Sequence, residues 1–141
     1  MKIAFYKGRR PGWHGWLSRL ITLADAGKYS HCELVFSDGL CASASLMDGG
    51  VRLKKIDFEP GHWDVIDVGG LEHQARAWFE QHQGAGYDLP GSLGIAVRIM
   101  PQAEARWFCS EAVAAALGFV EPWRIGPNTL YALMRPPPAP K

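Results

Sequence analysis

The chain has 141 residues, of which 48% are hydrophobic, and a formal net charge of +1. This length suits one domain with an ordinary core, and the composition is that of a globular protein, which excludes a fibrous or disordered chain. A net charge close to zero gives no electrostatic reason to expect nucleic acid or an anionic membrane as a partner. The three cysteines are an odd number, so they exclude a complete disulfide framework and leave at least one free thiol.

The N-terminal residues and the hydropathy bear on location. The first ten residues, MKIAFYKGRR, are too short and too polar for a signal peptide, and no apolar run reaches the roughly 20 residues that span a bilayer. We therefore expect no transmembrane segment and a protein that is cytoplasmic as synthesised, in a reducing compartment. A phage protein that is carried in a virion or released by lysis would have the same features.

Apolar and alternating runs in the first half of the chain predict five short strands. They are expected over residues 3–6, 29–36, 40–45, 51–56 and 63–68. Turn residues such as Ser37-Asp38-Gly39 separate neighbouring strands, so we expect an antiparallel meander. Between the first two strands, apolar residues recur at helical spacing and predict an amphipathic helix over 13–24.

The second half of the chain is predominantly helical in pattern. Helices are predicted over 71–83 and over the alanine-rich stretch 109–117, which Gly118 ends. We predict a single domain over 1–135 and a proline-rich tail over 136–141. Strands followed by helices place the fold in the α+β class, with a small antiparallel sheet packed against helices.

Cys109 opens the alanine-rich helix and is the candidate nucleophile. A helix N-terminus carries partial positive charge and unpaired backbone N–H groups, and both favour the thiolate. The same N–H groups can hold an oxyanion. Ser110 and Glu111 are polar residues of the kind that first turns favour. The alternative is that Cys109 fills space in the core beside Phe108.

A cysteine nucleophile needs a base, and His31 is the best placed of the five histidines. It lies in a predicted strand, where alternation puts Glu33 on the same face and Cys32 on the other. A third group must orient the imidazole. Glu33, a backbone carbonyl, or Ser43 and Ser45 on the returning strand are the candidates, and a purely structural histidine is the alternative.

Metal and nucleotide sites have little support in the sequence. Cys32, Cys41, Cys109 and His31 are residue types that bind zinc, but the chain has no C-x₂-C pair. The glycines form neither a P-loop nor a dinucleotide-binding fingerprint. We therefore expect no metal and no cofactor.

Five stretches, taken in chain order, carry a family resemblance. They read LITLADAGKYSHCELVFSDG, SASLMDGGVRLKKI, GYDLPGSLG, RWFCSEAVAAALGF and GPNTLYALM. The order of YSH opening a strand, then GYD, then FCSE opening a helix is similar to the circularly permuted, papain-like form of the NlpC-type cysteine peptidase and amidase superfamily. This superfamily also includes relatives of lecithin retinol acyltransferase. The resemblance implies a small sheet or half-barrel packed against helices, with the nucleophile at a helix N-terminus.

The resemblance also implies roles for individual residues. Cys109 would be the nucleophile, His31 the general base, and Tyr87 would border the site and help to hold the oxyanion. The third polar residue of the family falls at Ser43, with Ser45 one alternation further along. Serine departs from the His, Asn, Gln or acidic residue usual there and is a poor charge partner for an imidazolium, which Glu33 would compensate if its strand is suitably placed.

The function that the resemblance implies is thiol-dependent hydrolysis of an amide bond in a bacterial cell-wall peptide, with peptidoglycan as the partner. Acyl transfer or thioester hydrolysis on a lipid or thioester substrate is the first alternative. A non-catalytic phage or bacterial interaction module that retains the fold is the second.

Overall fold

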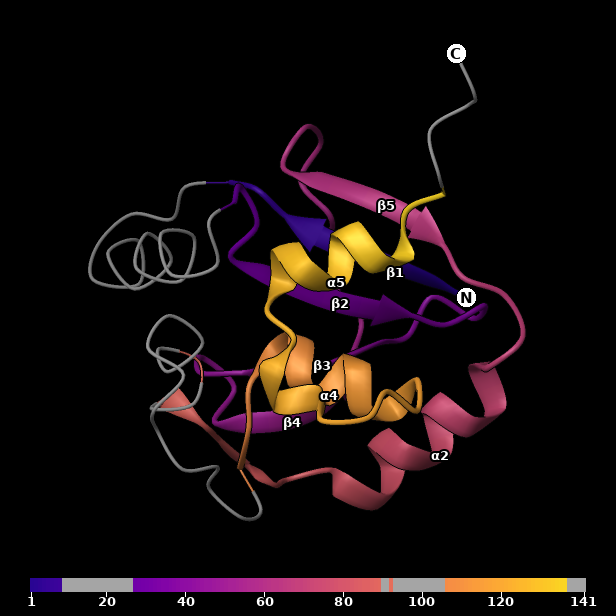
Figure 1. Cartoon of the computed structure of the whole chain (residues 1–141). Coiled ribbons are helices and arrows are strands. Elements are labelled where there is room, and N and C mark those ends of the chain that lie inside the picture. Colours follow the sequence, from indigo (N-terminus) through magenta and orange to yellow (C-terminus); the bar gives the residue numbers. More distant parts are fainter. Residues whose placement is uncertain (9–26, 90–91, 93–105, 137–141) are drawn as a thin grey trace.

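A sheet of seven strands forms the centre of the computed structural model, which describes residues 1–8, 27–89, 92 and 106–136 (Figure 1). Along the chain, these strands are β1 (Lys2–Tyr6), β2 (His31–Val35), β3 (Cys41–Ser45), β4 (Gly50–Lys54), β5 (Trp63–Asp67), β6 (Gly86–Tyr87) and β7 (Arg106–Trp107). The five strands predicted from the sequence are therefore present. The predicted helix over 13–24 lies outside the described residues, as does most of the proline-rich tail.

The strand order is β5-β1-β2-β3-β4-β6-β7. Strands β1 to β4 form an antiparallel meander as predicted, but β5 does not continue it. Instead β5 returns to the opposite edge and pairs with β1, matching Ile3 with Ile66. The reason is burial: Ile3 and Phe5 are fully buried, and an edge position for β1 would leave one side of its backbone unpaired. All these pairs are antiparallel, and among the described strands only the short β6–β7 contact is parallel.

Three α-helices occur in the described residues, together with one short 3₁₀ helix. They are α2 (Glu72–His82), α4 (Cys109–Ala116) and α5 (Pro127–Met134), with the 3₁₀ helix η1 over Pro122–Arg124. Figure 1 shows α4 and α5 in front of the strands, and α4 packs against β2, β3 and α2. A largely antiparallel sheet with helices packed against it confirms the α+β class.

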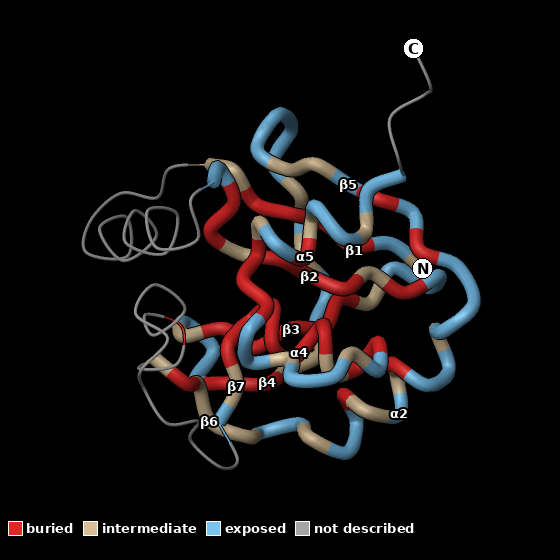
Figure 2. Tube along the Cα trace, viewed as in Figure 1, coloured by how far each residue is buried: buried red, intermediate tan, exposed pale blue. Residues whose placement is uncertain are grey.

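Helix α4 is the most deeply buried helix, as the red tube in Figure 2 shows. All of its residues except Ala115 are buried, and the small side chains of Ala112 and Ala114 allow its backbone to approach the sheet closely. It ends as predicted: Gly118 adopts a φ of 82° and donates its N–H to the Ala115 carbonyl. Over the described residues, no helix combines the length and apolar character needed to cross a membrane.

Candidate active site

Cys109 is the first residue of α4, directly after the extended residue Phe108. Its side chain is in the core, with 3% of the residue exposed. The Glu111 carboxylate turns back and accepts the Phe108 N–H at 3.3 Å, which fixes the start of the helix. The chain therefore enters α4 in a defined geometry, with the thiol at the end of the helix where backbone N–H groups are unpaired by the helix itself.

His31 is the first residue of β2 and lies against Cys109. Its Nε2 is 2.6 Å from Oε1 of Glu33, and the Cys109 thiol is hydrogen-bonded to the imidazole. Burial lowers the pKa of His31, but the charge and hydrogen bond of Cys109 and then the Glu33 carboxylate raise it more, to about 9. Because Nε2 is engaged by Glu33, Nδ1 is the nitrogen that remains for the thiol.

The pKa of Cys109 lies well below its ordinary value. The hydrogen bond from the Cys32 thiol lowers it most, burial opposes this, and the charge and hydrogen bond of His31 lower it further. The raised pKa of His31 and the lowered pKa of Cys109 both favour the thiolate and imidazolium pair, which is the reactive form of a cysteine nucleophile.

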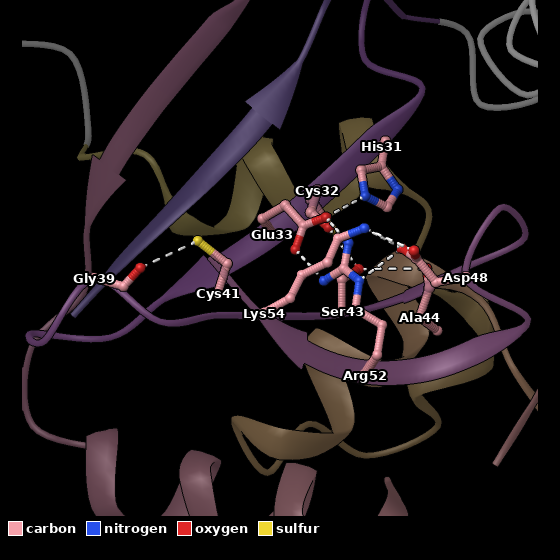
Figure 3. A network of polar contacts seen from close by, with 10 residues as sticks. All are labelled: His31, Cys32, Glu33, Gly39, Cys41, Ser43, Ala44, Asp48, Arg52 and Lys54. Atoms are coloured by element: carbon pink, nitrogen blue, oxygen red, sulfur yellow. Dashed lines mark hydrogen bonds and ion pairs between the residues drawn. The ribbon is translucent and has the colours of Figure 1, made fainter. Parts of the chain in front are cut away.

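Glu33 is the group that orients His31, and it is only 1% exposed. Burial raises its pKa, but hydrogen bonds from Arg52 and then from His31 outweigh this and lower the pKa below its usual value. Figure 3 shows the carboxylate between the two cationic side chains. An ionised acid therefore stands behind the imidazole, as the orienting residue of a triad does.

The two serines that the family pattern favoured have other partners. The Ser43 hydroxyl donates to the backbone carbonyl of Cys32 at 2.7 Å, as Figure 3 shows. Ser45 is buried at the end of β3, and among the described residues its hydroxyl has no hydrogen bond to His31. Of the candidate side chains from the sequence, Glu33 is thus the one that contacts the imidazole.

Tyr87 lies in β6, opposite Trp107 of β7. Burial raises the pKa of its phenol, the charge of Cys109 raises it further, and a hydrogen bond with Ser92 opposes both. The phenol is therefore close enough to Cys109 for the charge of the thiolate to act on it, and its raised pKa favours the neutral form, which can donate a hydrogen bond.

An aromatic cluster lies beside His31. The Trp63 ring lies 6.4 Å from the imidazole and packs against Tyr6 at 5.0 Å and Phe58 at 4.9 Å. Tyr6 and Trp63 are paired residues on β1 and β5, so the misplaced expectation for β5 concealed this cluster. A second cluster joins Trp78 and His82 of α2 to Trp107 of β7, the residue paired with Tyr87.

Sequence reasoning also missed Arg52 and Cys32 as parts of the site. In the predicted strand 51–56, Arg52 is one of the basic residues that alternate with apolar ones, a pattern typical of a half-exposed strand, and it does not indicate a partner for Glu33. Within the described residues, no three His, Cys, Asp or Glu side chains are grouped so as to hold a metal ion. No protein-family model matches the chain, and no curated protein matches it significantly in sequence.

Proposed function

We propose that the protein is a thiol hydrolase in which Cys109 is the nucleophile, His31 the general base and Glu33 the residue that orients it. The observation that carries this proposal is the contact series from the Cys109 thiol through the His31 ring to the Glu33 carboxylate. We further propose that the fold is the circularly permuted papain-like form of the NlpC-type superfamily, which the order of histidine strand, Tyr87 strand and cysteine helix supports.

The proposed reaction has two halves. In the first half, His31 holds the proton of the Cys109 thiol, and the Cys109 sulfur attacks the acyl carbon to give a tetrahedral oxyanion. The N-terminal N–H groups of α4 would stabilise this oxyanion, with the Tyr87 hydroxyl as a further donor. The imidazolium then protonates the leaving amine, and a thioester remains. Water, deprotonated by His31, hydrolyses the thioester and restores the thiol.

The leading substrate class is an amide bond of a bacterial cell-wall peptide. Acyl transfer or thioester hydrolysis on an apolar acyl chain is the second candidate, and the aromatic cluster of Tyr6, Phe58 and Trp63 beside His31 favours it. The two classes use the same nucleophile and base and differ in the leaving group and the acceptor. A panel of muropeptides and fatty-acyl thioesters therefore distinguishes them.

The test begins without a substrate. Iodoacetamide should alkylate Cys109 rapidly at pH values well below 8.5, the ordinary pKa of a free thiol, because the lowered pKa of Cys109 favours the thiolate. Cys41 is buried and burial raises its pKa, so it is the internal control in the same mass-mapping experiment. A Cys109 that reacts no faster than Cys41 would overturn the enzyme proposal and leave the interaction module.

Substitutions then test the roles on whichever substrate the panel identifies. Cys109→Ala should abolish turnover, and His31→Ala should reduce it by about 10²–10⁴-fold, the usual contribution of general acid–base catalysis. His62→Ala is the matched control, because His62 is an exposed histidine that pairs with Glu59. Full activity of the His31→Ala protein would contradict the assignment of the base.

A further inference from the structure

The carboxylate of Glu33 has two cationic partners, and they share one of its oxygen atoms. Oε1 accepts from Nε2 of His31 and also from Nη2 of Arg52, while Oε2 accepts from Nη1 of Arg52 at 2.7 Å. Arg52 thus binds Glu33 through both ends of its planar fork, the geometry in which arginine holds a carboxylate most firmly. A carboxylate buried to this degree would be strongly destabilising without such a partner.

Arg52 reaches Glu33 across an intervening strand. Glu33 is on β2 and Arg52 on β4, and β3 lies between them, so the two backbones are separated by roughly 9.5 Å, twice the strand spacing. The residue paired with Arg52 on β3 is Ser43, whose small side chain donates a hydrogen bond to the Cys32 carbonyl. Figure 3 shows the guanidinium passing this position to reach Glu33. A large residue at 43 would block the passage.

A second carboxylate holds the outer side of Arg52. The Arg52 Nε donates to Oδ2 of Asp48 at 2.9 Å, and the Asp48 carboxylate also accepts from Nζ of Lys54 at 2.7 and 2.8 Å. The network of Glu33, Arg52, Asp48 and Lys54 therefore contains two anions and two cations. The net charge of these four side chains is zero, and His31 is not counted among them.

We propose that Arg52 is a positioning residue that acts through Glu33: it neutralises the carboxylate that orients His31, so that the ring is held in place while its proton can still be transferred. This inference rests on the proposed function for its catalytic meaning. A buried carboxylate whose only partner was His31 would hold the imidazolium so firmly that the base could not be regenerated. Arg52 supplies the compensating charge and leaves His31 free to exchange its proton.

The surroundings of His31 define what a titration would report. Among the described residues, Glu33 faces it from β2, Cys109 from α4, and Arg52 acts from β4 through Glu33. Strand β1 contributes the ring of Tyr6, which is the residue paired with His31, and strand β5 contributes the ring of Trp63. The phenol of Tyr87 on β6 is near Cys109, and Cys32, the next residue of β2, also contacts the thiol.

The test is an NMR titration of His31 in protein labelled at histidine ¹³Cε1, with the signal assigned by its loss in His31→Gln. The wild-type midpoint should lie near 9. Arg52→Gln should raise the midpoint by about one unit, because the positive charge of the guanidinium bound to the Glu33 carboxylate is removed. Glu33→Gln should move it in the opposite direction, because the anion that favours the imidazolium is lost.

Lys54→Gln is the matched control: it removes the same charge from the same strand, but Lys54 contacts Asp48 and not Glu33. Its midpoint should stay close to the wild-type value. Arg52→Lys, which keeps the charge but loses the fork, should fall between wild type and Arg52→Gln, and it serves if Arg52→Gln does not fold.

An unchanged or lowered midpoint in Arg52→Gln, or in Arg52→Lys if it replaces that variant, would overturn the proposal. A lowered value would mean that Arg52 only keeps Glu33 in place as a structural ion pair. The titration needs no substrate, so it is separate from the test of the function. An inert Cys109 together with a raised midpoint in Arg52→Gln would refute the proposed hydrolase and leave the charge relation between Arg52 and His31 intact.

Discussion

The thiol of Cys109 depends on two neighbouring residues of one strand. Alternation along β2 predicts His31 and Cys32 on opposite faces of the sheet, yet both lower the pKa of Cys109, and Cys32 contributes most. Cys109 lies at the N-terminal end of α4, beside the first two residues of β2, so its thiol is within reach of both. A buried thiolate with a second hydrogen-bond donor is more stable than one that has the imidazole alone.

Replacing Cys32 with alanine should therefore make Cys109 less acidic. We expect the midpoint of Cys109 alkylation by iodoacetamide, followed by peptide mass mapping across pH, to rise by roughly one unit. Cys32→Ser keeps a donor and should restore most of the wild-type midpoint. Cys41→Ala is the control, since Cys41 is equally buried but donates to the Gly39 carbonyl. Equal midpoints for Cys32→Ala and wild type would show that the imidazole alone sustains the thiolate.

The sequence predicted the members of the site better than their connections. Strand alternation placed Glu33 beside His31, and the structure joins them, because neighbours on one face of a strand are a local property. Arg52 could not be assigned in this way, since its partner is two strands away and only the register of β3 and β4 brings it there. Ser43 matched the spacing of the family pattern, but its hydroxyl donates its hydrogen bond to the Cys32 carbonyl and not to His31.

At the level of elements, one glycine determines how β6 joins the sheet. Gly50 begins β4 and pairs with Gly86 of β6, the strand that carries Tyr87. Its φ is 147°, and a Cβ atom there would lie 1.9 Å from the carbonyl oxygen of Ala85. That oxygen accepts the Val51 N–H at 2.8 Å, so it cannot move without breaking the junction. Only glycine fits this backbone conformation and this close approach.

Gly50→Ala should consequently lower the free energy of unfolding by about 2–3 kcal/mol, from a strained φ together with a backbone clash. Chemical denaturation with a two-state fit measures the loss. Gly49→Ala is the matched control, because Gly49 also has a positive φ, of 80°, but no atom lies within 4 Å of its added Cβ. It should cost about 1 kcal/mol. Equal losses for the two variants would contradict the role of the Ala85 carbonyl.

The elements that the sequence predicted least well are those defined by their neighbours. Strands β1 to β4 and helices α2 and α4 follow local periodicity and turn residues, and their observed bounds lie within two residues of the expected ones. Strand β5 was also expected, but its pairing with β1 reflects the need to cover a buried strand. Strands β6 and β7 have two residues each, too few for any alternating pattern to be visible.

Across the whole molecule, carboxylates tie distant segments together. Asp64 on β5 accepts from Lys28 at 2.8 Å and from the Tyr29 hydroxyl at 2.6 Å, and it also pairs with Lys7 after β1. Asn128 of α5 exchanges two hydrogen bonds of 2.9 Å with the backbone of Tyr29. The edge strand, the start of β2 and the last helix are therefore joined through residues 28 and 29, a connection that no local sequence pattern reveals.

These carboxylates determine how stability responds to acid. Hydrogen bonds from Lys28, then Lys7 and Tyr29, lower the pKa of Asp64 well below its usual value. Burial raises the pKa of Asp48, but hydrogen bonds from Lys54 and Arg52 outweigh it and lower the pKa to about 2. A carboxyl whose pKa is lower in the folded state binds fewer protons there than when unfolded, so stability rises with pH across that interval.

The stabilisation from both groups is complete above their unfolded pKa of about 3.9 and is lost as the pH falls through the folded values. The melting temperature should therefore be level near neutral pH and decrease steeply between about pH 4 and pH 2. Asp64→Asn should melt lower than wild type at pH 7 and show a shallower decrease in acid, because asparagine has no proton to gain. Asp67→Asn, at an exposed residue 4.0 Å from the Lys2 amine, is the control and should retain the wild-type decrease. Parallel melting curves for Asp64→Asn and wild type from pH 7 to pH 2 would mean that Asp64 does not contribute to the acid response, which would then come from other carboxylates with lowered pKa values, among them Glu33 and Asp48.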